Sequence, residues 1–303
     1  EILVDLYLII QFYHKSVRGY SFFTQKNPVI SRVMAFRKRL KLKLKGGEKM
    51  IKGILFDKDG TLIDFSLWRD AGINTIQNIL DEYNLNNDML IRELQRAIGI
   101  KENGVEPFGA LAYRSHEDLA CELHFILNKH VDIDLDKFKI HVTELLRKEV
   151  LKDNVEFKEI VDIKKLYEYL NSNNIKMGMA TADSKQSAMH MINKLNLNDC
   201  FDFIGSYDGI MKQKPHNDMC MRFCSMYNLE PNEVAIVGDS YSDMLFAINS
   251  GAIGVGVLSG VSSKINLKDV ANVIVPSVES LLDAEVLEAL DEKSYGVREL
   301  QTA

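Results

Sequence analysis

The sequence predicts an α/β fold, with a Rossmann-like parallel sheet core and an inserted helical cap domain. Two patterns carry this prediction. Short apolar runs alternate with helix-like stretches, which is typical of a parallel sheet with helices on both faces. The alternation is broken once, directly after the first apolar run, by a long interval with only helical patterns. The chain has 303 residues, 46% of them hydrophobic, which is enough for one sizeable domain and a smaller one.

Each apolar run is predicted to be a buried strand because it is short and bounded by polar or turn-forming residues. The predicted strands are residues 51–56, 175–180, 201–205, 234–237, 253–258 and 273–275. Between them, the interval without a strand has helical periodicity over residues 71–83, 88–98, 116–129 and 136–151. We therefore assign residues 50–65 and 156–303 to the core. Residues 66–155 are assigned to the cap, which is expected to cover the sheet edge that follows the first strand.

The charge is unevenly distributed along the chain. The net charge is −6, yet residues 1–49 carry eleven Lys and Arg against three acidic residues, a net +8. The remainder carries 26 basic against 40 acidic residues, a net −14. Such an acidic body is a poor candidate for nucleic-acid binding. The four cysteines are too sparse for a disulfide framework, so buried free thiols and a reducing cytoplasm are expected.

Residues 1–49 are predicted to be a translated leader rather than native protein. The segment Gly-Gly-Glu-Lys-Met at 46–50 can be encoded by a purine-rich stretch that resembles a bacterial ribosome-binding site before a start codon. The alternative is a real basic segment, with seven Lys and Arg in residues 32–45, that touches an anionic membrane. No membrane partner is expected unless that segment is real, because the apolar stretch 2–13 is too short to span a bilayer.

The first predicted strand ends in the motif Asp57-Lys58-Asp59-Gly60-Thr61. Taken alone, this motif is equally typical of a turn. In parallel α/β sheets, however, ligands bind at the carboxyl ends of the strands. If the backbone stays extended, Asp57 and Asp59 project to the same side and Lys58 points away, to solvent or to the cap.

Polar groups also follow three further predicted strands. Thr181 ends the second strand, Lys214 follows the third, and Asp239 and Asp243 come directly after the fourth. Each has an ordinary explanation on its own, such as helix capping for the two aspartates. Their occurrence together, in this order, favours a functional site at one edge of the sheet.

These four motifs and the position of the insert resemble the haloacid dehalogenase superfamily of phosphohydrolases, over essentially all of residues 50–290. The insert resembles the helical C1-type cap of phosphoglycolate phosphatase-like and β-phosphoglucomutase-like enzymes. The segment Gly-Val-Gly-Val-Leu-Ser-Gly at 254–260 also resembles the phosphoglycolate phosphatase branch. Asp59 favours phosphate esters as substrates, because a halide leaves without needing a proton.

The resemblance and the chemistry of the residues imply a phosphatase with a covalent intermediate. Asp57 would attack the phosphoryl group and form an aspartyl-phosphate. Asp59 would protonate the leaving oxygen and later accept a proton from the attacking water. Lys214 would neutralise charge on the transferring group, and Thr181 would hold phosphoryl oxygens.

The resemblance also implies Mg²⁺ as the cofactor, because two carboxylates facing a phosphate dianion need a cation between them. The ligands implied are the Asp57 side chain, the Asp59 backbone carbonyl and Asp239. Asp243 would be an outer ligand or would orient a metal-bound water. The turn after the nucleophile, with its free backbone N–H groups, assigns Gly60 and Thr61 to substrate binding.

Substrate specificity is expected to lie in the cap. Residues 100–116 are predicted to be a loop between helices, from which Arg114 could bind a substrate carboxylate. A solvated arginine on a helix connection is an equal alternative. Trp68 is assigned to substrate binding as a wall of the pocket, with a role in seating the hinge as the alternative.

The expected function is a Mg²⁺-dependent phosphatase for a small phosphorylated metabolite, closest to phosphoglycolate phosphatase. A phosphomutase of the β-phosphoglucomutase type is the alternative enzyme. A non-catalytic regulator that binds a phosphorylated ligand is less favoured, because every catalytic group is present. The expected partner is a small-molecule phosphate ester, and the protein is expected to be a cytoplasmic monomer or homodimer.

Overall fold

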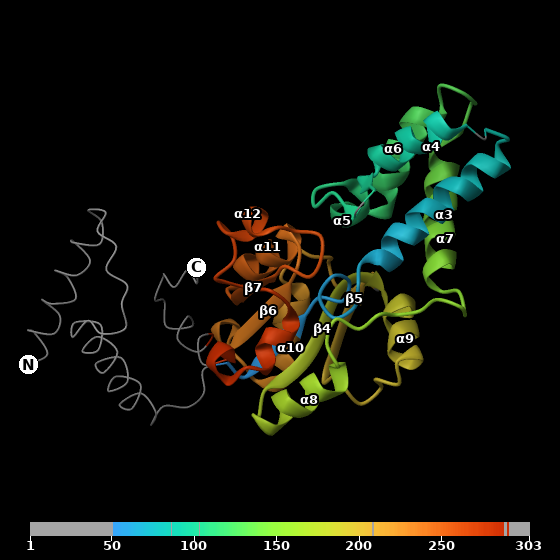
Figure 1. The fold of residues 1–303 in the computed structure, drawn as a ribbon. Helices are drawn as coiled ribbons and strands as arrows, with labels where there is room; N and C mark the ends of the chain where they lie inside the picture. Colours follow the sequence, from blue (N-terminus) through green and yellow to red (C-terminus); the bar gives the residue numbers. More distant parts are fainter. Residues whose placement is uncertain (1–50, 86, 103, 208, 288–289, 291–303) are drawn as a thin grey trace, which may run out of the picture. The chain divides into compact units, whose positions relative to one another are not determined.

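Within the described residues, six parallel strands form one sheet in the order β5-β4-β1-β6-β7-β8 (Figure 1). The computed structural model describes residues 51–85, 87–102, 104–207, 209–287 and 290. The predicted α/β fold class is confirmed. The strands are β1 (Gly53–Phe56), β4 (Lys176–Ser184), β5 (Phe203–Tyr207), β6 (Val234–Gly238), β7 (Ile253–Val257) and β8 (Val273–Val275).

The two faces of the sheet are packed separately. Along β1, Ile54 and Phe56 belong to one hydrophobic cluster, whereas Leu55 between them belongs to another. This alternation follows from the two-residue period of a strand, which sends neighbouring side chains to opposite faces. All four residues of β1 are buried, as expected for a central strand covered on both sides.

Helices of the core cover both faces. Helices α8 (Ile163–Ser172) and α9 (Lys185–Lys194) pack against the cluster that contains Phe56, and α10 (Asp218–Tyr227) and α11 (Tyr241–Ser250) pack against the other. Three of these helices begin at a side-chain cap. Asp162, Ser184 and Ser240 each accept a hydrogen bond from a backbone N–H of the first turn.

A third hydrophobic cluster holds together the helices inserted after β1. These helices are α3 (Ser66–Glu82), α4 (Asp88–Ala97), α6 (His116–Leu127) and α7 (Leu135–Val150). The segment predicted to be a loop is more structured than expected. It contains a short antiparallel pair, β2 (Ile100–Lys101) with β3 (Gly104–Val105), and the short helix α5 (Ala110–Tyr113).

Two smaller findings complete the fold. No helix among the described residues is long and apolar enough to cross a bilayer. The predictions for residues 1–49, a leader or a membrane-touching segment, fall outside the described residues.

Candidate active site

The predicted polar residues meet at the carboxyl ends of three neighbouring strands. Asp57 directly follows β1, Thr181 lies within β4, and Asp239 directly follows β6. Because β4 and β6 flank β1 on either side, these three positions share one edge of the sheet. Asp243 joins them from the first turn of α11.

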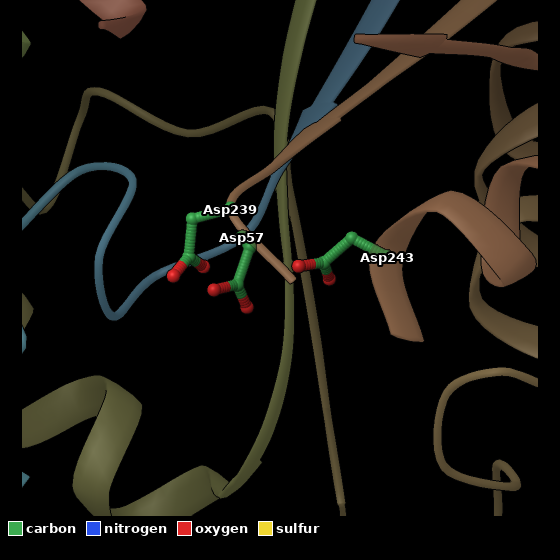
Figure 2. A group of neighbouring side chains, drawn as sticks. All are labelled: Asp57, Asp239 and Asp243. Carbon is green, nitrogen blue, oxygen red and sulfur yellow. The ribbon is translucent and has the colours of Figure 1, made fainter. Parts of the chain in front are cut away.

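Three of these aspartates form a compact acidic group (Figure 2). Carboxylate oxygens of Asp57, Asp239 and Asp243 all lie within 4.8 Å of one another. The side chains of Asp57 and Asp239 lie beside each other, and Asp243 reaches toward them from its helix. Asp239 and Asp243 are almost completely buried, and so is most of Asp57.

Lys214 is the cation of this group. Its Nζ lies 2.5 Å from Asp57 Oδ1 and 2.6 Å from Asp243 Oδ1. The other oxygen of Asp243 accepts hydrogen bonds from the backbone N–H and the hydroxyl of Ser240 at 3.0 and 2.6 Å. Both oxygens of Asp243 therefore have protein partners, so its clearest role in this structure is to hold Lys214 and cap α11.

Burial shifts the protonation of the group. Desolvation raises the pKa of Asp57 to about 7, partly opposed by Lys214 and reinforced by Asp243 and Asp59. Desolvation and the charge of Asp57 likewise raise the pKa of Asp239 well above its ordinary value. Burial alone would lower the pKa of Lys214, but Asp243 and Asp57 outweigh it and the pKa is raised.

Two glycines let the chain close around Asp239. Gly60 has φ +82°, and a Cβ there would lie 2.5 Å from Asp239 Oδ2. A Cβ on Gly260 would lie 2.0 Å from the same oxygen. That oxygen instead accepts a hydrogen bond of 2.7 Å from the backbone N–H of Val261. Both glycines are thus required by the close approach of the backbone to this carboxylate.

A second ion cluster lies beside the first. The ammonium of Lys58 is 2.8 and 2.7 Å from the two oxygens of Asp59, and 2.9 Å from Asp183 Oδ2. The prediction that Lys58 points to solvent is wrong, because Lys58 is completely buried. Its ion pairs are with Asp59 and Asp183, which both lie outside the residues predicted to form the cap. The extended backbone assumed for it ends with β1, and Leu62 and Ile63 both donate their backbone N–H groups to the Lys58 carbonyl.

The residues assigned to phosphate binding have identifiable surroundings. The buried Thr181 hydroxyl accepts a hydrogen bond of 3.1 Å from the Asp183 N–H. The Gly60 N–H donates to the carbonyl of Ile63 at 2.6 Å, so this N–H is engaged within the protein. Thr61 is completely buried, and its hydroxyl has no hydrogen-bond partner among the described residues. An orphaned hydroxyl next to the catalytic turn is consistent with a polar ligand there.

The two cap residues assigned to substrate binding have other contacts. Arg114 forms a half-exposed ion pair with Glu122 at 2.7 Å, a contact made entirely within the inserted helices. Trp68 is buried in the cluster of those helices, packs its ring 5.4 Å from His116, and offers its indole as a hydrogen-bond donor to Asp59. Its burial agrees better with the hinge alternative than with a pocket wall.

Sequence reasoning missed an aromatic contact between the insert and the core. The ring of Phe108 lies 5.8 Å from Tyr241, the first residue of α11, in an edge-on arrangement. Phe108 also packs edge-on against Tyr113 at 5.8 Å. Phe108 is half exposed, so part of its ring faces solvent beside this contact.

The donor set fits a hard divalent cation. All three members of the acidic group offer carboxylate oxygens, the ligand type that Mg²⁺ prefers. When all three are ionised, their negative charge exceeds the positive charge of the Lys214 ammonium beside them, so this buried group favours a cation. Within this group, Asp57 and Asp239 are the candidate ligands.

Known proteins are similar to this chain in sequence and in fold. The pyrophosphatase PpaX of Bacillus pumilus is 24% identical over 210 residues, which cover 69% of this chain and 84% of that protein. A phosphoglycolate phosphatase of Chromobacterium violaceum is 30% identical over 105 residues, covering 35% and 46%. The crystal structure of a β-phosphoglucomutase of Clostridium difficile superimposes with a TM-score of 0.56 at 19% identity, covering 81% of this chain and 99% of that one.

The family assignment rests on a match to a whole family model. Residues 54–257 match the model described as haloacid dehalogenase-like hydrolase, and this range contains every residue of the acidic group and both lysines. The predicted resemblance is confirmed. The chain belongs to the haloacid dehalogenase-like hydrolase family and is a phosphatase-type enzyme of that family.

Proposed function

We propose that this protein is a Mg²⁺-dependent phosphatase that hydrolyses a small phosphorylated metabolite through an aspartyl-phosphate on Asp57. The observation that carries the proposal is the position of Asp57. It follows the central strand, lies within 4.8 Å of two other buried aspartates and pairs with Lys214 at 2.5 Å. A carboxylate so placed can attack a phosphoryl group whose negative charge is balanced by the ammonium next to it.

Each residue then has a defined task. Asp57 attacks phosphorus. The ammonium of Lys214, which pairs with the Asp57 carboxylate before the reaction, then balances the negative charge of the phosphoryl group. Asp59 protonates the leaving oxygen and then takes a proton from the water that hydrolyses the intermediate. Thr181 and Thr61 offer hydroxyl groups at the same edge of the sheet. Bound Mg²⁺ would supply the charge that lets a phosphate dianion approach the carboxylates.

The substrate class follows from the inserted helices. We propose a core of residues 50–65 and 156–303 and a cap of residues 66–155. The Phe108–Tyr241 contact brings the insert to the first turn of α11, two residues before Asp243. A substrate bound under this contact would be small, as a phosphoglycolate-like phosphomonoester is.

The experiment is a substrate panel with matched variants. The full chain is assayed with phosphorylated metabolites in Mg²⁺ and after EDTA treatment. We expect Mg²⁺-dependent phosphate release, and a loss of several orders of magnitude in Asp57→Asn with the fold retained by circular dichroism. Near-normal turnover of Asp57→Asn would exclude the covalent mechanism.

A single-turnover reaction in ¹⁸O-labelled water separates hydrolysis from phosphomutase activity. A phosphatase places one solvent oxygen in the released phosphate, because water attacks the aspartyl-phosphate. A phosphomutase returns the phosphoryl group to a sugar hydroxyl and yields an unlabelled sugar phosphate. A chain that binds phosphate esters without turnover in either assay would be the regulator.

A further inference from the structure

Lys58 is the least expected residue of the site. Its side chain is completely buried, although lysine is among the residues least often found fully buried. An ammonium has three N–H donors, and its three short contacts are the two oxygens of Asp59 and Asp183 Oδ2. Burial lowers the pKa of Lys58, but the two aspartates outweigh it and the pKa is raised. Lys58 is therefore a fixed cation.

Asp183 is itself anchored by the junction between β4 and α9. Its backbone N–H donates to the Thr181 hydroxyl at 3.1 Å, and its Oδ2 accepts a hydrogen bond of 2.8 Å from the Ser187 hydroxyl. Ser184, the next residue, caps α9 through the N–H of Ser187. The carboxylate that faces Lys58 is thus held by a strand and a helix rather than by a loose loop.

The turn after β1 fixes the backbone on both sides of Asp59. The Lys58 carbonyl accepts hydrogen bonds from the N–H groups of Leu62 and Ile63, and the Gly60 N–H donates to the Ile63 carbonyl. These bonds hold the backbone but not the carboxylate, whose side-chain partners are Lys58 and the indole of Trp68. A proton donor must lie within hydrogen-bond reach of the leaving oxygen, so this position controls the proposed chemistry.

We propose that Lys58 and Asp183 are positioning residues, which fix the Asp59 carboxylate for proton transfer. This inference rests on the proposed function, in which Asp59 is the acid and base. Lys58 acts as a bridge: Asp183, held by β4 and α9, sets the place of the ammonium, and the ammonium sets the place of the Asp59 carboxylate. Neither residue touches the phosphoryl group.

The leaving group provides the decisive test. An alkyl phosphate needs a proton on its leaving oxygen, whereas 2,4-dinitrophenyl phosphate has a leaving group stable as an anion. For Lys58→Met in the full chain, we expect kcat/KM to fall at least about tenfold for the alkyl ester and to change less than about threefold for the dinitrophenyl ester. Asp59→Asn should show the same selectivity with a larger loss.

Two further variants guard against a folding artefact. Lys58→Met with Asp183→Asn removes one cation and one anion, so the buried charges stay balanced, and it should keep the selectivity of Lys58→Met. Lys176→Met is the control. It removes the ion pair between Lys176, the first residue of β4, and Asp202, at 2.8 Å, and it leaves the partners of Asp59 unchanged. We expect this control to change kcat/KM for the alkyl ester and for the dinitrophenyl ester by the same factor.

A second readout does not depend on activity. Trp68 is the only tryptophan of the chain, so its indole N–H gives a single resonance in ¹⁵N-labelled protein. Because this N–H donates toward Asp59, displacing the carboxylate should move the resonance upfield. We expect a shift in Lys58→Met and in the double variant, and none in Lys176→Met.

The outcomes separate this inference from the proposed function. Equal losses for both esters in Lys58→Met, or an unchanged indole resonance, would overturn the positioning role and leave a merely structural ion pair. A wild-type protein that hydrolyses neither ester, or an Asp59→Asn variant with full alkyl activity, would overturn the proposed function. In that case the indole resonance still decides whether Lys58 places Asp59.

Discussion

The metal-free protein is expected to lose stability as the pH rises from 5 to 8, and Asp57→Asn should remove much of this loss. Burial raises the pKa of Asp57 from 3.8 to about 7. Between these two values the folded protein holds a proton that the unfolded chain has released. The free energy of unfolding therefore falls as the pH rises through this window, and stops falling above the folded pKa.

The magnitude follows from the shift. Each pH unit in the window costs about 1.4 kcal/mol, so the loss attributable to Asp57 between pH 5 and pH 8 is about 2 to 3 kcal/mol. The raised pKa of Asp239 has the same sign and adds to the loss. Asparagine at position 57 carries no charge and also relieves Asp239, whose pKa Asp57 helps to raise.

The assay is urea unfolding in EDTA at several pH values, followed by circular dichroism. Asp269→Asn, which changes an exposed carboxylate outside the acidic group, is the matched control. Excess Mg²⁺ should flatten the pH dependence of the wild type, because the cation replaces the proton as counter-charge. If wild type and Asp57→Asn show the same slope, or if wild-type stability rises with pH, the reasoning is refuted.

Three further predictions concern single residues. Gly260→Ala should destabilise the protein by about 1–3 kcal/mol and raise the Mg²⁺ concentration for half-maximal activity, because its Cβ would lie 2.0 Å from Asp239. Urea unfolding measures the first effect and a Mg²⁺ titration the second, and an unchanged titration would contradict this prediction. Lys214→Met should lower kcat by about 10²–10³-fold at saturating substrate, because a donor that stabilises negative charge is lost. A kcat within about threefold of wild type, the size of change expected when an exposed lysine is replaced, would argue against this role. Phe108→Ala should raise KM more than it lowers kcat if the Phe108–Tyr241 contact encloses the substrate; steady-state kinetics decide, and an equal change of both would point to a structural role.

The parts of the site that were predicted from sequence share one physical basis. Asp57 and Asp239 directly follow apolar runs, and parallel strands bring such positions to one edge. The predicted proximity of these two residues depends only on strand order and not on loop conformation. This is why they are found together within 4.8 Å.

The parts that were missed depend on local backbone turns and on partners far away in the chain. The solvent-facing position predicted for Lys58 assumes an extended backbone, but the chain turns at Gly60 and Lys58 is buried. Its partner Asp183 follows Thr181 by two residues, at the end of the neighbouring predicted strand. An unexplained carboxylate at that strand end was the available signal, and pairing it with the lysine in the first motif would have located the cluster.

The pairing of β1 also bears on how the enzyme is made. The strand that leads to Asp57 is synthesised early, yet its two neighbours, β4 and β6, end at Ser184 and Gly238. During synthesis, Asp57 therefore leaves the ribosome before the strands that pair with β1 have been made. The inserted helices, which have a hydrophobic cluster of their own, can already pack at that stage. Nascent chains that end before Gly238 should lack phosphatase activity, because they contain neither the end of β6 nor Asp239.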